Sequence, residues 1–136
     1  QGGMAIYMGL GPIHTLGHIF ADSDLHHGAL ITAAAPAVMR FYADNPDAGL
    51  TDRLLRIRDV MGLQPDADIA QAITDINTRL GLSSSIRELG YPDRNLDALA
   101  DAAMTVHFNA TAPRKPTRAR LESTARPIGQ VVRIIR

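Results

Sequence analysis

The sequence predicts an all-α fold, a helical bundle that forms one domain over residues 1–136. Apolar side chains recur at steps of three and four residues, which is the spacing of one face of an α-helix. Residues that cap helix N-termini precede these segments, and glycines suited to C-terminal caps follow them. The main β-branched cluster, at 131–135, predicts no more than a short strand or a frayed helix.

The helical spacing is clearest in three segments, from Thr51 to Gly62, from Asp66 to Gly81, and after Asn95. Their repeating apolar positions are Leu54, Ile57 and Met61; Ile69, Ile73, Ile76 and Leu80; and Leu96, Leu99, Ala103 and Val106. Each segment opens with a side chain that can accept hydrogen bonds from free helix N–H groups. We therefore expect Thr51, Asp66 and Asn95 to be N-caps.

Further stop and start signals fit this reading. Ser85 and Glu88 have the spacing of a capping box and predict a short helix. The glycines that follow apolar runs are expected to adopt left-handed C-terminal caps: Gly62, Gly81 and Gly90.

A long apolar helix is predicted from His27 to Tyr42, before a turn at Asn45 to Gly49. Pro36 lies inside it and removes one backbone hydrogen bond. Alanines surround this proline, so we expect burial on several sides and a central place in the bundle.

Composition excludes several classes of function. The formal net charge is zero, with 14 basic and 14 acidic residues, so we expect neither nucleic acid nor a membrane as partner. The absence of cysteine restricts a metal site to histidine or oxygen ligands. No apolar run reaches the roughly 18 residues of a membrane span, and no secretory signal pattern is present, so we expect a cytoplasmic protein.

Four of the five histidines lie within fourteen residues: His14, His18, His26 and His27. On a helix His14 and His18 share one face, from which two imidazoles can address one zinc, iron, copper or nickel ion. Gly17 allows a close approach beside them. Ordinary packing is the competing interpretation, and Thr15 replaces the glutamate that a metalloprotease motif requires. His26 and His27 point in different directions, so one of them at most joins the site; His107 is expected to be an ordinary, partly buried histidine.

The motifs together resemble the C-terminal domain of iron-containing (group III) alcohol dehydrogenases, a dehydroquinate synthase-like fold. The resemblance rests on residues 9–18, with histidines four apart, on His26-His27-Gly28, and on Pro36, nine residues after His27. Downstream, residues 85–92, 96–103 and 111–117 are similar to later segments of that family. The likeness covers roughly residues 4 to 125.

The resemblance implies hydride transfer between NAD or NADP and a small alcohol or aldehyde, with Fe²⁺ or Zn²⁺ as a Lewis acid. By position, His14 and His27 are metal ligands. His26 is the alternative to His27, because the interval from His18 is one residue shorter than in the family. His18 matches a histidine beside the nicotinamide and the substrate, so it is the predicted catalytic and cofactor-binding residue.

The family's other two metal ligands and its dinucleotide-binding domain would precede Gln1, so we expect a fragment that is inactive alone. We expect the fragment to self-associate through an apolar face that is left exposed. The protein is also expected to be a homo-oligomer. Ile31 and Ala112 stand where the family has asparagine. Two alternatives stay open at this stage. One is a metal-independent reductase similar to the maleylacetate reductases. The other is a non-catalytic helical module that binds a metal or a partner through its histidines.

Overall fold

The computed structural model describes residues 10–20, 23–44, 46–91 and 96–117. Within them the chain forms five α-helices and one 3₁₀ helix, and no strand. The helices are α2 (Gly11–Ile19), α3 (His27–Ala43), α4 (Ala48–Val60), α5 (Ile69–Arg79), α6 (Leu96–Thr105) and η1 (His107–Thr111). The all-α prediction is confirmed, while the β-branched cluster at 131–135 lies outside the described residues.

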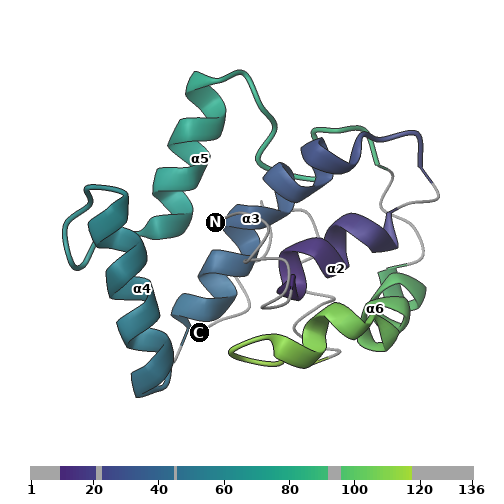
Figure 1. The fold of residues 1–136 in the computed structure, drawn as a ribbon. Helices are drawn as coiled ribbons and strands as arrows, with labels where there is room; N and C mark the ends of the chain where they lie inside the picture. Colours follow the sequence, from purple (N-terminus) through teal and green to yellow (C-terminus); the bar gives the residue numbers. More distant parts are fainter. Residues whose placement is uncertain (1–9, 21–22, 45, 92–95, 118–136) are drawn as a thin grey trace.

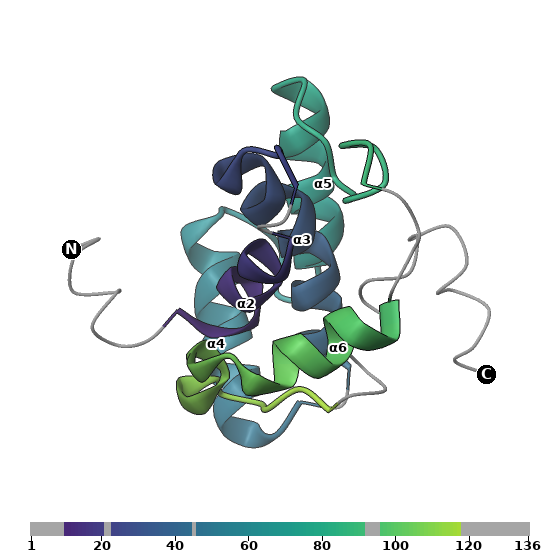
Figure 2. The ribbon, with the colours of Figure 1, turned by 90° about the vertical axis from the view of Figure 1, so that its right-hand side faces the viewer.

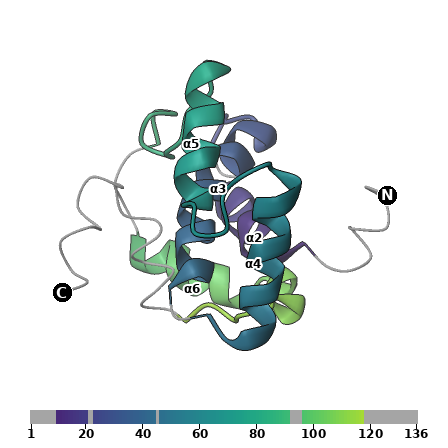
Figure 3. The same ribbon diagram turned by 90° about the vertical axis from the view of Figure 1, so that its left-hand side faces the viewer.

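Helix α3 lies at the centre of the bundle, as predicted (Figure 1). It packs against α2 on one side and against α4 and α5 on the other, and α2 in turn contacts α6 and η1. Figures 2 and 3, which view the molecule of Figure 1 from its two opposite sides, show α6 and η1 running beneath α2 and α3. None of the described helices has the length and apolar character needed to cross a membrane.

Three buried clusters hold these helices together. Leu16, Ala34, Val38, Ala100 and Ala103 join α2, α3 and α6, where the small alanines allow close approach. A second cluster joins α3, α4 and α5 through Met39, Leu50, Leu54, Ile69 and Ala70. A third contains Phe20, Leu30 and Leu99, and the Phe20 ring meets Tyr91 edge-on at 4.6 Å between centroids. Full burial of each large apolar side chain stabilises the fold by roughly 1.5–3 kcal/mol.

Pro36 is fully buried inside α3 and lacks the N–H that would bond to the carbonyl of Thr32, four residues earlier. That carbonyl accepts a hydrogen bond of 3.3 Å from Nδ2 of Asn77 on α5. The same Nδ2 donates to Oγ of Ser84 at 3.1 Å. Asn77 is only 3% exposed, so a buried amide compensates for the proline and fastens α5 to α3.

Two of the predicted N-caps are wrong. Helix α4 begins at Ala48, capped by Asp47, whose carboxylate accepts from the N–H of Leu50 at 2.7 Å. Helix α5 begins at Ile69, capped by Asp68, which accepts from Ala70 and Gln71. Thr51 lies inside α4 and Asp66 precedes the true cap by two residues. In each case the carboxylate nearest the first helical residue reaches the free N–H groups. Asn95 lies outside the described residues.

The C-terminal caps after α4 and α5 are confirmed, because Gly62 and Gly81 have φ of 68° and 67°. Gly90 also has a left-handed φ, of 88°, but the residues directly before it form turns rather than a helix, so its predicted role as a helix cap is wrong. The short helix expected after Ser85 is instead a run of turns. Oγ of Ser85 does accept from the N–H of Glu88, as the capping box requires, but the Glu88 carboxylate accepts from Ser84. Gly90 follows too soon for a helix to propagate beyond its costly first turn.

Candidate metal centre

Helix α2 brings two histidines to one face. It begins after Leu10, which supplies no side-chain cap, and Pro12 occupies its first turn, where a missing N–H costs nothing. His14 and His18 are one turn apart on this helix, as the sequence predicts. His14 is half-buried and His18 is exposed.

His27 is the first residue of α3 and His26 is its N-cap. Nδ1 of His26 accepts a hydrogen bond of 3.1 Å from the N–H of Gly28. This bond turns the His26 ring back toward its own helix. The neighbouring His27 ring faces α2 instead.

The three predicted imidazoles meet where α2 and α3 cross. The ring centroids of His14 and His27 are 5.5 Å apart, and those of His18 and His27 are 5.0 Å apart. Gly17 is the residue of α2 against which Ile31 and the His27 ring of α3 pack. A Cβ on Gly17 would lie 2.7 Å from Cδ1 of Ile31 and 3.1 Å from Cε1 of His27, so the missing side chain makes this convergence possible.

An aromatic ring that sequence reasoning missed completes the cluster. Phe108, on η1, lies 5.0 Å from the His18 ring and 6.2 Å from the His14 ring. The ring of its neighbour His107 lies 4.2 Å from it, tilted by 52°. His107 is exposed, so the expectation that it is partly buried is wrong. His107 is the first residue of η1. The side-chain hydrogen bonds from η1 to α2 and α6 are made by Asn109, and His107 lies on the outer side. No periodic signal in the sequence marks Phe108.

Asn109 ties η1 to α2. Its Oδ1 accepts a hydrogen bond of 2.9 Å from Oγ1 of Thr15, and its Nδ2 donates to the carbonyl of Ala103 at 2.8 Å. Thr15 is completely buried. The residue that follows His14 therefore fixes the segment that carries Phe108.

The surroundings of His14 favour its neutral form. Burial, and then the nearby His27 and His18, lower the pKa of this imidazole below its usual value of 6.5. A neutral imidazole is the form that coordinates a metal.

The donor set suits a metal of the zinc or iron type but is incomplete among the described residues. Two imidazoles bonded at about 2.0–2.1 Å to one ion have ring centres roughly 5 Å apart, and His14 and His27 are at 5.5 Å. In the described part of the chain, however, no group of three or more histidine and acidic side chains is arranged to hold an ion. Stable sites use three or four protein ligands, so these two imidazoles fit part of a site.

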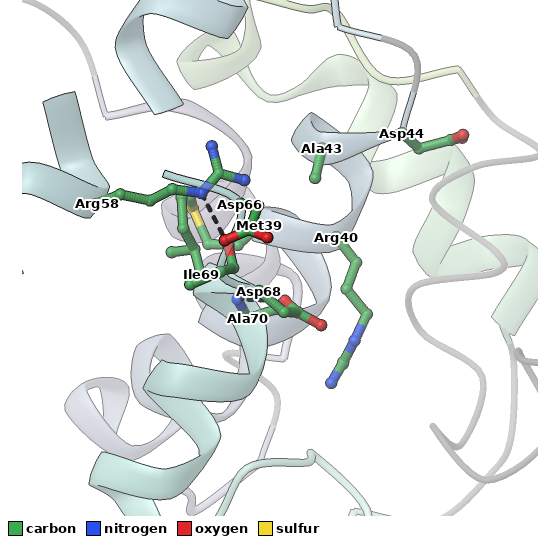
Figure 4. Close-up of a pocket in the computed structure, with 10 residues that line it drawn as sticks. Met39, Arg40, Ala43, Asp44, Arg58, Asp66, Asp68, Ile69 and Ala70 are labelled. Carbon is green, nitrogen blue, oxygen red and sulfur yellow. Dashed lines mark hydrogen bonds between the residues drawn. The ribbon is translucent and has the colours of Figure 1, made fainter. Parts of the chain in front are cut away.

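A separate cavity of about 280 Å³ lies between the far end of α3 and the α4–α5 connection (Figure 4). Arg58 and Asp68 line it, and both are engaged in holding that connection. Nε of Arg58 donates to the carbonyl of Ala67 at 2.8 Å, and Asp68 caps α5. Met39 and Ala43, which also line it, are at least twelve residues along α3 from His27, which places the cavity about 18 Å from the imidazoles.

Comparison with known proteins identifies the family to which this helical bundle belongs. Residues 2–128 match the Fe-containing alcohol dehydrogenase family, C-terminal. The chain therefore belongs to this family, and the resemblance inferred from its motifs is confirmed.

A relative named 4-hydroxybutyrate dehydrogenase, from Cupriavidus necator, is 39% identical over 125 residues. The match covers 88% of this chain and 33% of the relative. The chain thus spans about a third of the length of the relative that it matches.

Proposed function

We propose that this chain is the helical metal-binding domain of an NAD(P)-linked alcohol dehydrogenase, in which His14 and His27 bind a divalent iron or zinc ion. The observation that carries the proposal is the 5.5 Å separation of their rings, across the junction of two helices. The lowered pKa of His14 supports it, because that imidazole is ready to coordinate without first losing a proton.

When bound, the metal would supply Lewis-acid polarisation of the alcohol or carbonyl oxygen. The residues of this chain would bind, orient and move protons around that centre. The His18 side chain is exposed and its ring centroid is 5.0 Å from that of His27, which supports a role in holding or passing a proton beside the substrate. It is our candidate catalytic residue and our candidate contact to the nicotinamide.

The remaining ligands and the dinucleotide-binding domain would come from the rest of the enzyme, since two imidazoles alone do not hold a catalytic ion firmly. The 136-residue chain alone would then show no turnover. The name of the relative makes 4-hydroxybutyrate, a short hydroxy acid, the first substrate to test.

Metal analysis of the whole enzyme tests the proposal. His14→Ala and His27→Ala should each lower affinity for Fe²⁺ or Zn²⁺ by more than about 100-fold, since even outer-shell losses reach about 10–100-fold. His26→Ala is the matched control and should retain the metal while weakening the cap of α3. Metal lost in His26→Ala but kept in His27→Ala would instead make His26 the ligand.

Chelation separates the two catalytic possibilities. Activity that disappears with a chelator and returns with Fe²⁺ or Zn²⁺ supports the metal-dependent dehydrogenase. Full activity in a metal-free enzyme would favour a metal-independent reductase of the same superfamily. No turnover of any alcohol or aldehyde by the metal-loaded whole enzyme would overturn the proposal.

We also propose that the chain self-associates. Apolar side chains are exposed at the end of α4, where Val60 is 86% accessible, and just beyond α5, where Leu80 is 66% and Leu82 45% accessible. Apolar surface of this kind marks contact sites in proteins. Light scattering during size-exclusion chromatography should show a dimer or larger species, and a clean monomer would contradict this.

A further inference from the structure

We infer that Phe108 is a specificity-determining residue of the candidate site, and that Asn109 is the positioning residue that holds it there. The inference rests on the proposed function and adds to it a limit on the size of the alcohol. It starts from the ring contacts of Phe108, which lies 5.0 Å from His18 and 6.2 Å from His14. In this inference the apolar ring forms one wall of the substrate pocket beside the imidazoles.

Packing alone does not account for Phe108. Its side chain is half-buried and belongs to none of the three buried clusters. Its ring contacts in the described structure are with histidines, two of which belong to the candidate site. A large apolar residue that stays partly accessible beside polar rings is typical of the lining of a ligand pocket.

The position of the ring is set by polar contacts of the next residue. Asn109 accepts from the buried hydroxyl of Thr15 and donates to the carbonyl of Ala103. Thr15 lies between His14 and His18 on α2, so the helix that carries these two imidazoles also positions the aromatic wall through this hydrogen bond. The two imidazoles and the wall are thereby held in a fixed arrangement.

The wall predicts selection for alcohols with a short, unbranched carbon chain. In the metal-loaded whole enzyme, Phe108→Ala should raise kcat/KM for longer or branched alcohols relative to short ones by roughly 10-fold or more, since even one methylene in an apolar pocket is worth about 10-fold. Met104→Ala, which removes an exposed side chain of α6, is the control and should leave the ratio unchanged. An unchanged ratio in Phe108→Ala would overturn the specificity role.

The positioning role has its own test. Asn109→Ala and Thr15→Val should shift the selectivity ratio in the same direction as Phe108→Ala, while Thr15→Ser, which keeps the hydroxyl, should restore it. In the metal-free protein, ring-current shifts of the His18 imidazole protons should disappear in Phe108→Ala and change in Asn109→Ala. Variants that lose stability without moving either readout would show a merely structural role. If the wild type turns over no alcohol, the proposed function fails, and His18 signals unchanged in Asn109→Ala would separately overturn the positioning role.

Discussion

Nδ2 of Asn77 donates a 3.3 Å hydrogen bond to the carbonyl of Thr32, the acceptor that Pro36 leaves without a helical donor. Residues 45 positions apart thus complete the bonding of the central helix. The relationship makes a buried amide on α5 part of the structure of α3. We therefore expect the effects of substitutions at Asn77 and at Pro36 on the free energy of unfolding to depend on each other.

Asn77→Ala should destabilise the fold by about 1–3 kcal/mol, because it leaves the Thr32 carbonyl buried without its partner. In a Pro36→Ala background the same change should cost about 1 kcal/mol less, since an alanine in place of the proline would supply the missing N–H. Urea denaturation of the four proteins gives this coupling energy. Ser84→Ala isolates the second bond of Asn77, and strictly additive costs would contradict the dependence.

Gly17→Ala should weaken metal binding more than it weakens the fold. The new methyl group must displace Ile31 and the His27 ring, which lie 2.7 and 3.1 Å from its position. Overpacking costs about 1–3 kcal/mol, partly offset by the roughly 1 kcal/mol helix preference of alanine over glycine. We expect about a 10-fold or greater loss of affinity for Zn²⁺ in titrations of the whole enzyme.

Gly49→Ala on α4 is the matched control for that change, because its nearest neighbour is an ordinary contact at 3.6 Å. It should leave metal affinity unchanged and stabilise the fold slightly. Equal affinities in both variants would show that Gly17 does not govern the approach of α2 to α3.

Asp68→Ala should cost about 1 kcal/mol of stability, because it removes the acceptor for two N–H groups at the start of α5. Asp66→Ala is the comparison, since Asp66 is two residues from the true cap and exposed. Its cost should lie within about 0.5 kcal/mol of zero. Thermal unfolding of both variants checks this, and the reverse order would assign the cap to Asp66.

The metal-free protein should lose stability on acidification partly through His14. Its folded pKa is below the unfolded value of 6.5, so the unfolded chain binds more protons at mildly acidic pH. The loss of stability that His14 causes is absent well above pH 6.5 and grows as the pH falls toward the pKa of His14 in the folded protein. His14→Gln should therefore have a smaller drop in urea midpoint between pH 7.5 and pH 5.5 than the wild type. Identical drops would argue against a depressed pKa.

Local signals in the sequence were sufficient for α3, α4, α5 and α6, for the glycine caps after α4 and α5, and for the central place of α3. They were insufficient for the N-caps, where Asp66 and Asp68 both suit the role and only the register of α5 selects between them. They also failed at Ser85, since a capping box states how a helix starts and not whether enough residues follow it.

The candidate site likewise contains residues that the sequence could predict and one that it could not. The His14–His18 spacing is a local property of one helix, and the long-helix pattern placed His27 at a helix start. Phe108 reaches the site through the packing of η1 on α2, which includes the Thr15–Asn109 bond between residues 94 positions apart. A contact of that range leaves no periodic trace in the sequence.

The side chain of His26 caps α3 and so fixes where the helix begins, whatever precedes it. Ser23, Asp24 and Leu25 belong to neither α2 nor α3. An insertion or deletion there would alter the loop and leave both helices in register. We therefore expect a change in the number of residues between His18 and His27 to leave the start of α3, and with it the place of His27, unaltered.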